Sequence, residues 1–107
     1  ISFNYIFSLN FLDLSQNRLK YIGNMTFKNL FLLKYLNLSY NELKFINSSN
    51  LFENLQSLIE LDLSSNEIHF IDDLSFQSLS LLRNLYINSN YFLKFDSNLD
   101  KKIDGLV

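Results

Sequence analysis

Residues 33–43 read LKYLNLSYNEL and place two asparagines, Asn37 and Asn41, inside a run of leucines. The same frame recurs as LNFLDLSQNRL at 9–19, LIELDLSSNEI at 58–68 and LRNLYINSNYF at 82–92. All four stretches fit L-x-x-L-x-L-x-x-N-x-L, with Ile or Phe accepted at apolar places. The asparagines that this frame requires are spaced by 24, 25 and 24 residues. A fixed period in the twenties indicates an architecture of stacked repeats, in which each unit packs against its neighbours.

The leucine spacing explains each frame as a short strand followed by an inward turn. Leu36 and Leu38 point into a continuous core, while Asn37 between them points out of the sheet. Backbone groups in the turn lose contact with water, and a buried peptide group without a partner costs about 1–3 kcal/mol. An amide side chain both donates and accepts hydrogen bonds, so it can satisfy the turns of adjacent repeats. We therefore predict a structural asparagine ladder made of Asn17, Asn41, Asn66 and Asn90.

A second periodic set follows each strand and defines the rest of the repeat. Phe27, Phe52 and Phe76 each stand three residues before a leucine, and we expect them to fill the far side of the core. The predicted repeats are 9–32, 33–57, 58–81 and 82–105, with partial repeats at 1–8 and 106–107. The fourth repeat departs from the pattern, because Asp100 stands near the expected phenylalanine and Leu99 is its substitute. We interpret the chain as an internal slice of a longer array.

Composition limits the classes of function. The 107 residues are 48% hydrophobic, which is enough for a core. The net charge is −2 and no basic cluster occurs, so this segment lacks the sequence features of a nucleic-acid-binding surface. No apolar stretch reaches the roughly 20 residues that a membrane-spanning helix needs. Cysteine is absent, so the sequence gives no direct indication of the redox compartment.

The repeat unit extends to L-x-x-L-x-L-x-x-N-x-L-x-x-I-x-x-x-x-F-x-x-L-x-x over essentially the whole chain. This pattern resembles the typical, 24-residue class of extracellular leucine-rich repeats, as in Toll-like receptor ectodomains and chaoptin-like adhesion proteins. The resemblance implies an α/β solenoid, a horseshoe segment with a concave parallel β-sheet and an irregular or short-helical convex side. It also implies binding of a protein or other macromolecular ligand, and no catalysis. We further expect a receptor dimer or co-receptor as a partner, and no cofactor is predicted.

The concave face carries the first set of candidate binding residues, which are the exposed positions around the strand leucines. Aromatic side chains on a rigid sheet are common anchors of protein interfaces, and three carboxylates make this face mildly acidic. The alternative is that these side chains only favour strand pairing. The candidate ligand-binding residues are Phe11, Asp13, Gln16, Tyr35, Tyr40, Glu60, Asp62, Asn84 and Tyr86.

A lateral flank forms the second candidate surface, three and four residues after each ladder asparagine. A basic row of Lys20, Lys44 and His69 is expected beside an aromatic row of Tyr21, Phe45 and Phe70. Such a flank suits receptor pairing or an acidic ligand. The alternative, which we favour, is aromatic packing between neighbouring loops with a solvated basic edge. The single histidine has no nearby set of ligands, so no metal site is predicted.

Three N-x-S/T sequons mark candidate glycosylation sites at Asn24, Asn37 and Asn47. Asn24 and Asn47 are the better candidates because they fall on convex loops, whereas Asn37 lies within the strand frame.

We favour a ligand-binding, protein-interaction segment of an extracellular or cell-surface glycoprotein receptor. The resemblance to Toll-like receptor ectodomains implies a role in innate immune signalling. The first alternative is a structural or cell-adhesion leucine-rich repeat protein, and the second is an intracellular leucine-rich repeat adaptor. An enzyme is not expected, because the chain has no cysteine nucleophile, no glycine-rich phosphate loop and one isolated histidine.

Overall fold

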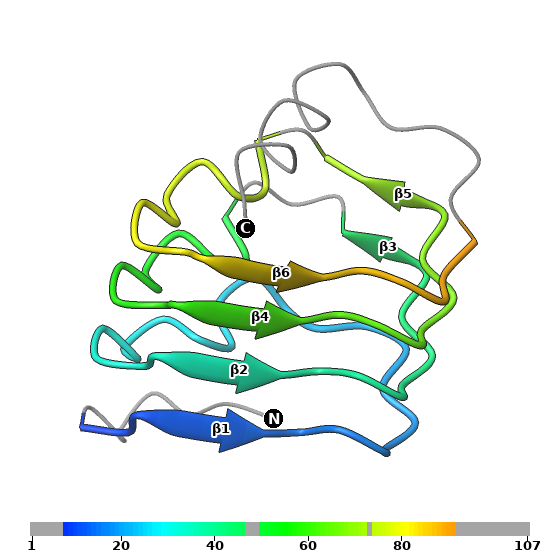
Figure 1. The fold of residues 1–107 in the computed structure, drawn as a ribbon, viewed down its shortest axis with the longest axis horizontal. Helices are drawn as coiled ribbons and strands as arrows, with labels where there is room; N and C mark the ends of the chain where they lie inside the picture. Colours follow the sequence, from blue (N-terminus) through cyan, green and yellow to red (C-terminus); the bar gives the residue numbers. More distant parts are fainter. Residues whose placement is uncertain (1–7, 47–49, 73, 92–107) are drawn as a thin grey trace.

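The computed structural model describes residues 8–46, 50–72 and 74–91. Its main feature is a parallel sheet of four short strands in the order β1-β2-β4-β6. These are β1 (Phe11–Asp13), β2 (Tyr35–Asn37), β4 (Glu60–Asp62) and β6 (Asn84–Tyr86). Figure 1 shows the four strands stacked side by side and pointing the same way, and the chain returns behind the sheet between one strand and the next. The chain is therefore a solenoid whose concave sheet receives one strand from each repeat.

The register of the sheet follows the repeat period. Leu12, Leu36, Leu61 and Leu85 are paired across the four strands, so the central residue of every strand is an inward leucine. The residues on either side of this leucine point to the opposite face, because side chains alternate along a strand. Two outward rows result: Phe11, Tyr35, Glu60 and Asn84 form the first, and Asp13, Asn37, Asp62 and Tyr86 form the second.

A second, two-stranded parallel sheet was not predicted from the sequence. It joins β3 (Phe45–Ile46) to β5 (Phe70–Ile71), with Phe45 opposite Phe70. In each strand the isoleucine is buried and the phenylalanine is exposed. In Figure 1 these strands lie where the chain runs back from the concave sheet. The lateral flank is thus held by backbone pairing as well as by side-chain packing.

The core lies between the concave sheet and the convex coils. Phe27, Phe52 and Phe76 are 0–1% exposed and stack in a column, with ring centroids 6.5 Å and 6.1 Å apart. Burying one such side chain contributes about 1.5–3 kcal/mol. The packed residues of the second and third repeats are almost fully buried, whereas Leu9, Leu12, Leu14, Leu19, Ile22, Leu85 and Ile87 are only partly buried.

The convex side consists of turns. Leu30 N donates to Phe27 O and Leu33 N donates to Leu30 O, both at 3.2 Å. Residues 8–46, 50–72 and 74–91 contain no helix, so the irregular form of the predicted convex side is the one observed there. Segments this short cannot recover the cost of helix nucleation. No described segment forms a helix long and apolar enough to cross a membrane.

Some sequence predictions fall outside the described residues. They concern Asn47, the departure of the fourth repeat at 99–100 and most of the two partial terminal repeats. The repeat boundaries themselves stay predictions.

Candidate interaction surfaces

The ladder asparagines connect each repeat to the one before it. Asn66 is 5% exposed, and its Oδ1 accepts a hydrogen bond from Leu43 N at 3.1 Å, one repeat back. Its Nδ2 donates to Leu38 O in that earlier repeat at 3.0 Å and to Leu63 O in its own at 3.1 Å. Asn41 makes the equivalent bonds to Leu19 N and Leu14 O. Asn90 does the same with Ile68 N and Leu63 O, and Asn17 bonds within its own turn. The ladder thereby fixes the turns that follow the concave strands.

Three carbonyl groups in this ladder, those of Leu14, Leu38 and Leu63, each accept hydrogen bonds from two asparagine side chains. Leu38 O accepts from both Asn41 Nδ2 and Asn66 Nδ2, at 3.1 Å and 3.0 Å. Leu63 O accepts in the same way from Asn66 and Asn90. A carbonyl oxygen has two lone pairs, so this sharing leaves neither bond compromised. The N–H groups of Leu43 and Ile68, by contrast, each donate to a single asparagine oxygen.

The residue before each ladder asparagine adopts a left-handed backbone conformation. The φ angles of Gln16, Tyr40, Ser65 and Ser89 lie between 54° and 58°. Non-glycine residues are strained in this region, because Cβ approaches the following carbonyl oxygen. Gln16 and Tyr40 therefore lie at the turn beyond the strands, and Tyr40 is 60% exposed there. Sequence reasoning missed this constraint, because none of the four positions holds glycine.

Three exposed aromatics stand on the concave strands themselves. Phe11 is 58% exposed, Tyr35 39% and Tyr86 42%. The Phe11 and Tyr35 rings contact each other across β1 and β2, with centroids 6.1 Å apart. Beside them, Glu60 Oε1 accepts a hydrogen bond of 3.4 Å from Asn84 Nδ2. The first outward row thus changes from aromatic to polar along the sheet.

The second outward row closes the strand ends with side-chain turns. Asp13 Oδ1 accepts from Ser15 N at 2.9 Å, and Asp62 Oδ1 accepts from both Ser64 N and Ser64 Oγ. Hydrogen bonds from the Ser15 hydroxyl and then from its backbone N–H lower the pKa of the exposed Asp13 carboxyl below its usual 3.8. In the described part of the chain, no cluster of three or more His, Cys, Asp or Glu side chains is arranged to hold a metal.

Asn37 belongs to this row and is half-buried rather than simply solvated. Its Oδ1 accepts hydrogen bonds from Ser39 N at 3.0 Å and from Ser39 Oγ at 2.7 Å. The structure therefore gives Asn37 a role in the turn that the sequence prediction did not include. The recurring triplets Asp13-Leu14-Ser15, Asn37-Leu38-Ser39 and Asp62-Leu63-Ser64 were the available signal, because Asp and Asn side chains often bond the backbone two residues later.

On the lateral flank Phe45 lies opposite Phe70, and ring contacts also join His69 to aromatic side chains. The His69 ring stacks on Phe45 at 5.9 Å and meets the edge of Tyr91 at 5.4 Å. Lys20 Nζ lies 4.0 Å from Glu42 Oε1, but exposed pairs of this kind contribute little. Tyr91 was missing from the predicted flank. It immediately follows Asn90, in the position that Glu42 occupies in the second repeat.

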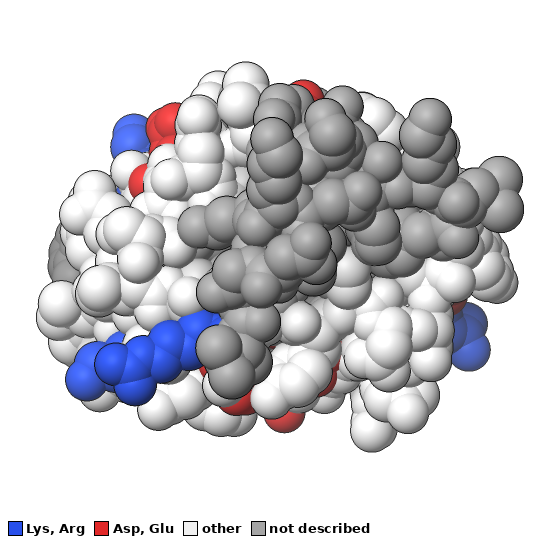
Figure 2. Space-filling model, turned by 45° about the horizontal axis from the view of Figure 1, so that its top comes forward, with Lys and Arg blue, Asp and Glu red and all other residues white. Residues whose placement is uncertain are grey.

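Charge is sparse on the molecular surface. Figure 2 shows Lys and Arg in a few small groups, with Asp and Glu close to them, among described residues that are mostly uncharged. The three candidate carboxylates of the concave sheet belong to Asp13, Glu60 and Asp62, on β1 and β4.

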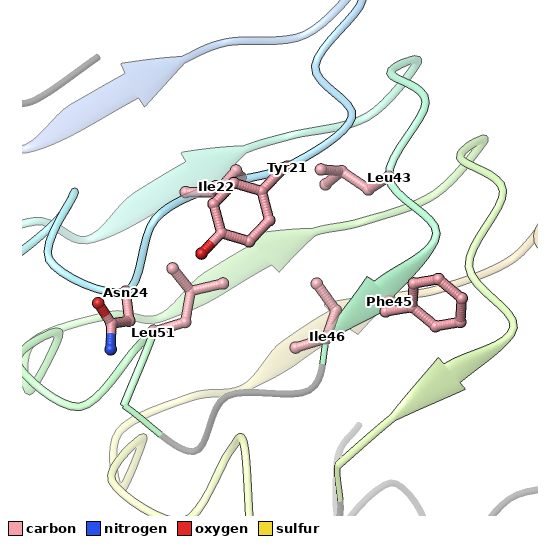
Figure 3. Close-up of a pocket in the computed structure, with 7 residues that line it drawn as sticks. All are labelled: Tyr21, Ile22, Asn24, Leu43, Phe45, Ile46 and Leu51. Atoms are coloured by element: carbon pink, nitrogen blue, oxygen red, sulfur yellow. The ribbon is translucent and has the colours of Figure 1, made fainter.

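A cavity of about 120 Å³ opens on the lateral side between the first and second repeats. Tyr21, Ile22 and Asn24 line it from the first repeat, and Leu43, Phe45, Ile46 and Leu51 line it from the second. Figure 3 shows the Tyr21 ring extending over this space, with its hydroxyl end on the side of Asn24, while the Phe45 ring points away toward β5. Asn24, the first of the predicted glycosylation sites, is exposed at this cavity.

The recurring strand, turn and ladder match a known family. The model of the leucine rich repeat family matches residues 7–51 and 48–92. This chain belongs to the leucine-rich repeat family. The matched ranges contain all four frames of the leucine-rich repeat pattern, from Leu9 to Phe92. No curated protein matches the chain.

Solved leucine-rich repeat structures resemble the chain over nearly its whole length. A chain in the structure of the Drosophila Toll–Spatzle complex is 33% identical to this chain, with a TM-score of 0.79 and coverage of 94% of this chain. A chain in the glycosylated form of that complex is also 33% identical, with a TM-score of 0.74 and coverage of 92%. A chain of the TLR13–ssRNA13 complex is 27% identical, with a TM-score of 0.87 over 95%. This leucine-rich repeat chain spans 13–14% of the length of those chains.

Proposed function

We propose that this leucine-rich repeat array is a ligand-binding segment of an extracellular, receptor-like protein of the Toll type, and that its concave sheet receives a protein ligand. The observation that carries the proposal is the in-register sheet that exposes Phe11, Tyr35 and Tyr86. Exposed aromatics usually supply the energetic centre of protein interfaces. The likeness to Toll and TLR13, both solved as complexes, supports the same assignment.

The concave aromatics are suited to binding because the sheet beneath them is rigid. Tyr35 is fixed from both sides: Tyr35 N donates to Asn10 O, and its strand pairs with β1 and β4. The asparagine ladder and the Asp13, Asn37 and Asp62 turns hold the strand ends. A side chain held on such a surface loses little conformational entropy when a partner covers it, so more of its contact energy contributes to affinity.

The chemistry of the face favours a protein over a nucleic acid. Asp13, Glu60 and Asp62 place carboxylates among the aromatics, and the chain as a whole has a net charge of −2. A phosphate backbone is bound mainly through Lys and Arg, and carboxylates repel it. The ssRNA in the TLR13 complex is a ligand of that protein. The ligand proposed here is a protein that offers apolar side chains next to lysine or arginine.

The proposal also includes location and the absence of catalysis. The likeness to Toll and TLR13 and the exposed sequon at Asn24 support an extracellular or cell-surface location. A binding array requires no catalytic group, and its output passes through whatever signalling partner or co-receptor the natural protein engages.

Site-specific photo-crosslinking tests the concave assignment. A photoreactive phenylalanine analogue is placed at Tyr35 or Tyr86 in the natural full-length protein, displayed on cells that normally express it. The matched positions are Phe45 and Phe70, which are similarly exposed aromatics on the lateral flank. We expect one protein to crosslink from both concave positions and from neither lateral position.

The affinity of variants of this chain for the crosslinked protein then shows whether the concave aromatics contribute to binding or only lie near the ligand. Truncating two hot-spot aromatics, Tyr35→Ala with Tyr86→Ala, is expected to weaken binding at least about thirtyfold, since such residues contribute roughly 2 kcal/mol or more. Phe45→Ala with Phe70→Ala should leave affinity within about threefold, as expected outside an interface centre. The opposite pattern assigns binding to the lateral flank. Full glycan occupancy at Asn37, mapped by mass spectrometry, also overturns the concave site, because the glycan stands beside Tyr35.

A further inference from the structure

Tyr21 is the most exposed large hydrophobic side chain in the described part of the chain, at 78%. Two other aromatics of the flank, Phe45 and Tyr91, have a ring partner, because both contact His69. Tyr21 takes part in none of the ring contacts found among the described residues. Burying an aromatic ring stabilises a fold, and the exposed Tyr21 ring does not contribute in this way. A group that covered the ring would gain this contribution.

Asn24 lies three residues after Tyr21 and lines the same cavity (Figure 3). Thr26 N donates to Gly23 O at 3.0 Å, so residues 23–26 form a tight turn with Asn24 and Met25 at its outer corner. Thr26 is 9% exposed and fixes the turn to the body of the repeat, while Asn24 is exposed. The turn therefore presents a sequon asparagine beside an exposed aromatic ring.

We propose that Asn24 carries an N-linked glycan whose first sugar packs on the Tyr21 ring at the mouth of this cavity. The C–H groups on one face of a pyranose ring are apolar and fit an aromatic face, while the tyrosine hydroxyl stays in water. The inference rests on the proposed extracellular function, because the chain must pass through the compartment where such glycans are attached.

The transfer involves one bond exchange. The Asn24 Nδ2 forms a bond to the anomeric carbon of an oligosaccharide carried on a polyprenyl diphosphate. The bond from that carbon to the diphosphate oxygen breaks, the lipid diphosphate leaves with the electron pair, and Nδ2 loses one proton. Thr26 supplies the hydroxyl that completes the sequon.

Asn37 offers a poorer environment for a glycan. It is half-buried in β2, with Asp13 and Asp62 as its partners across the sheet. Its Oδ1 already accepts two hydrogen bonds from Ser39, and the exposed ring on its own strand, Tyr35, belongs to the proposed binding face. A glycan at Asn37 also covers the concave aromatics, whereas one at Asn24 leaves that face open.

Occupancy and local protection test the inference separately. The natural full-length protein is expressed in animal cells, and glycopeptide mass spectrometry measures occupancy at each sequon. Hydrogen exchange of residues 21–26 is then compared before and after enzymatic removal of the glycan under native conditions. We expect exchange in the glycosylated form to be slower by about threefold or more, because packing the sugar on Tyr21 holds the turn closed.

Two variants provide the control for packing. Tyr21→Ala should abolish the difference in exchange between the glycosylated and deglycosylated forms, while Phe70→Ala, an exposed aromatic at the equivalent place two repeats later, should retain it. An occupied Asn24 with an unchanged exchange difference in Tyr21→Ala overturns the packing. An empty Asn24 in a protein glycosylated elsewhere overturns the site and leaves the proposed function intact. A natural protein that never enters the secretory route overturns both.

Discussion

Replacing Asn66 by alanine is expected to lower the free energy of unfolding by about 2–4 kcal/mol, and the hydrogen bonds show where this cost arises. Three carbonyl groups lose one donor each but retain another. Leu38 O keeps Asn41 Nδ2, and Leu63 O keeps Asn90 Nδ2. Ser64 O keeps the backbone N–H of Tyr40. These acceptors therefore remain satisfied.

The Leu43 N–H is different, because Asn66 Oδ1 is its acceptor and Leu43 is 2% exposed. A buried donor without a partner costs about 1–3 kcal/mol, and the lost side-chain packing adds to it. Asn41→Ala removes the acceptor of Leu19 N, but Leu19 is only partly buried and water can reach it. The expected cost of Asn41→Ala is therefore smaller, about 1–2 kcal/mol.

Urea unfolding of the natural full-length protein measures these differences in stability. Far-ultraviolet circular dichroism serves as the probe of the folded fraction. Asn10→Ala is the matched control, since this asparagine is exposed and its change should fall within about 0.5 kcal/mol. The expected order of destabilisation is Asn66, then Asn41, then Asn10. If Asn66→Ala unfolds at the same urea concentration as Asn10→Ala, the orphaned N–H does not carry the cost and the reasoning fails.

Three other outcomes are expected from single substitutions. Tyr40→Val should be about 1–2 kcal/mol less stable than Tyr40→Gly, because a β-branched residue is strained at a φ of 55°, and equal urea midpoints would contradict the strain. Phe52→Ala should cost about 3–5 kcal/mol in thermal unfolding, since it opens the middle of the stacked column, and a loss no larger than that of exposed Phe70→Ala would exclude this. The lowered pKa of Asp13 stabilises the fold above the ordinary value of 3.8, and this contribution is lost as the pH falls through the lowered pKa. Asp13→Asn should therefore weaken the pH dependence of the unfolding midpoint between pH 5 and 2, and an unchanged slope would refute it.

The sequence predicts the fold well where a physical requirement repeats with the frame. Inward leucines need every second position of a strand, so the period alone aligns Leu36 with Leu12 and Leu61. A phenylalanine at the same place in successive repeats predicts the column of stacked rings that contains Phe52. These features depend on residue type and spacing, which the sequence displays directly.

Features that depend on backbone geometry were harder to predict. The left-handed turn at Gln16 and Tyr40 is imposed by the ladder that follows it, and neither residue type indicates such a φ angle. The ring contacts of the flank depend on the offset between neighbouring coils, so the contacts of His69 with Phe45 and Tyr91 were not predicted. The short Asp13 turn did leave a signal, because its triplet recurs in the next two repeats.

The backward direction of the asparagine ladder has a consequence for how the chain is made. Asn41 and Asn66 each complete hydrogen bonds in the repeat that precedes them, at Leu19 N and Leu43 N. During synthesis from the N-terminus, a repeat therefore stays incomplete until the next asparagine has left the ribosome. Each newly made repeat supplies the last hydrogen bonds of the repeat before it, while its own N–H still waits for the next asparagine. Folding of the array therefore follows synthesis by one repeat. A chain stalled within the array therefore ends in one turn whose N–H still lacks its asparagine acceptor.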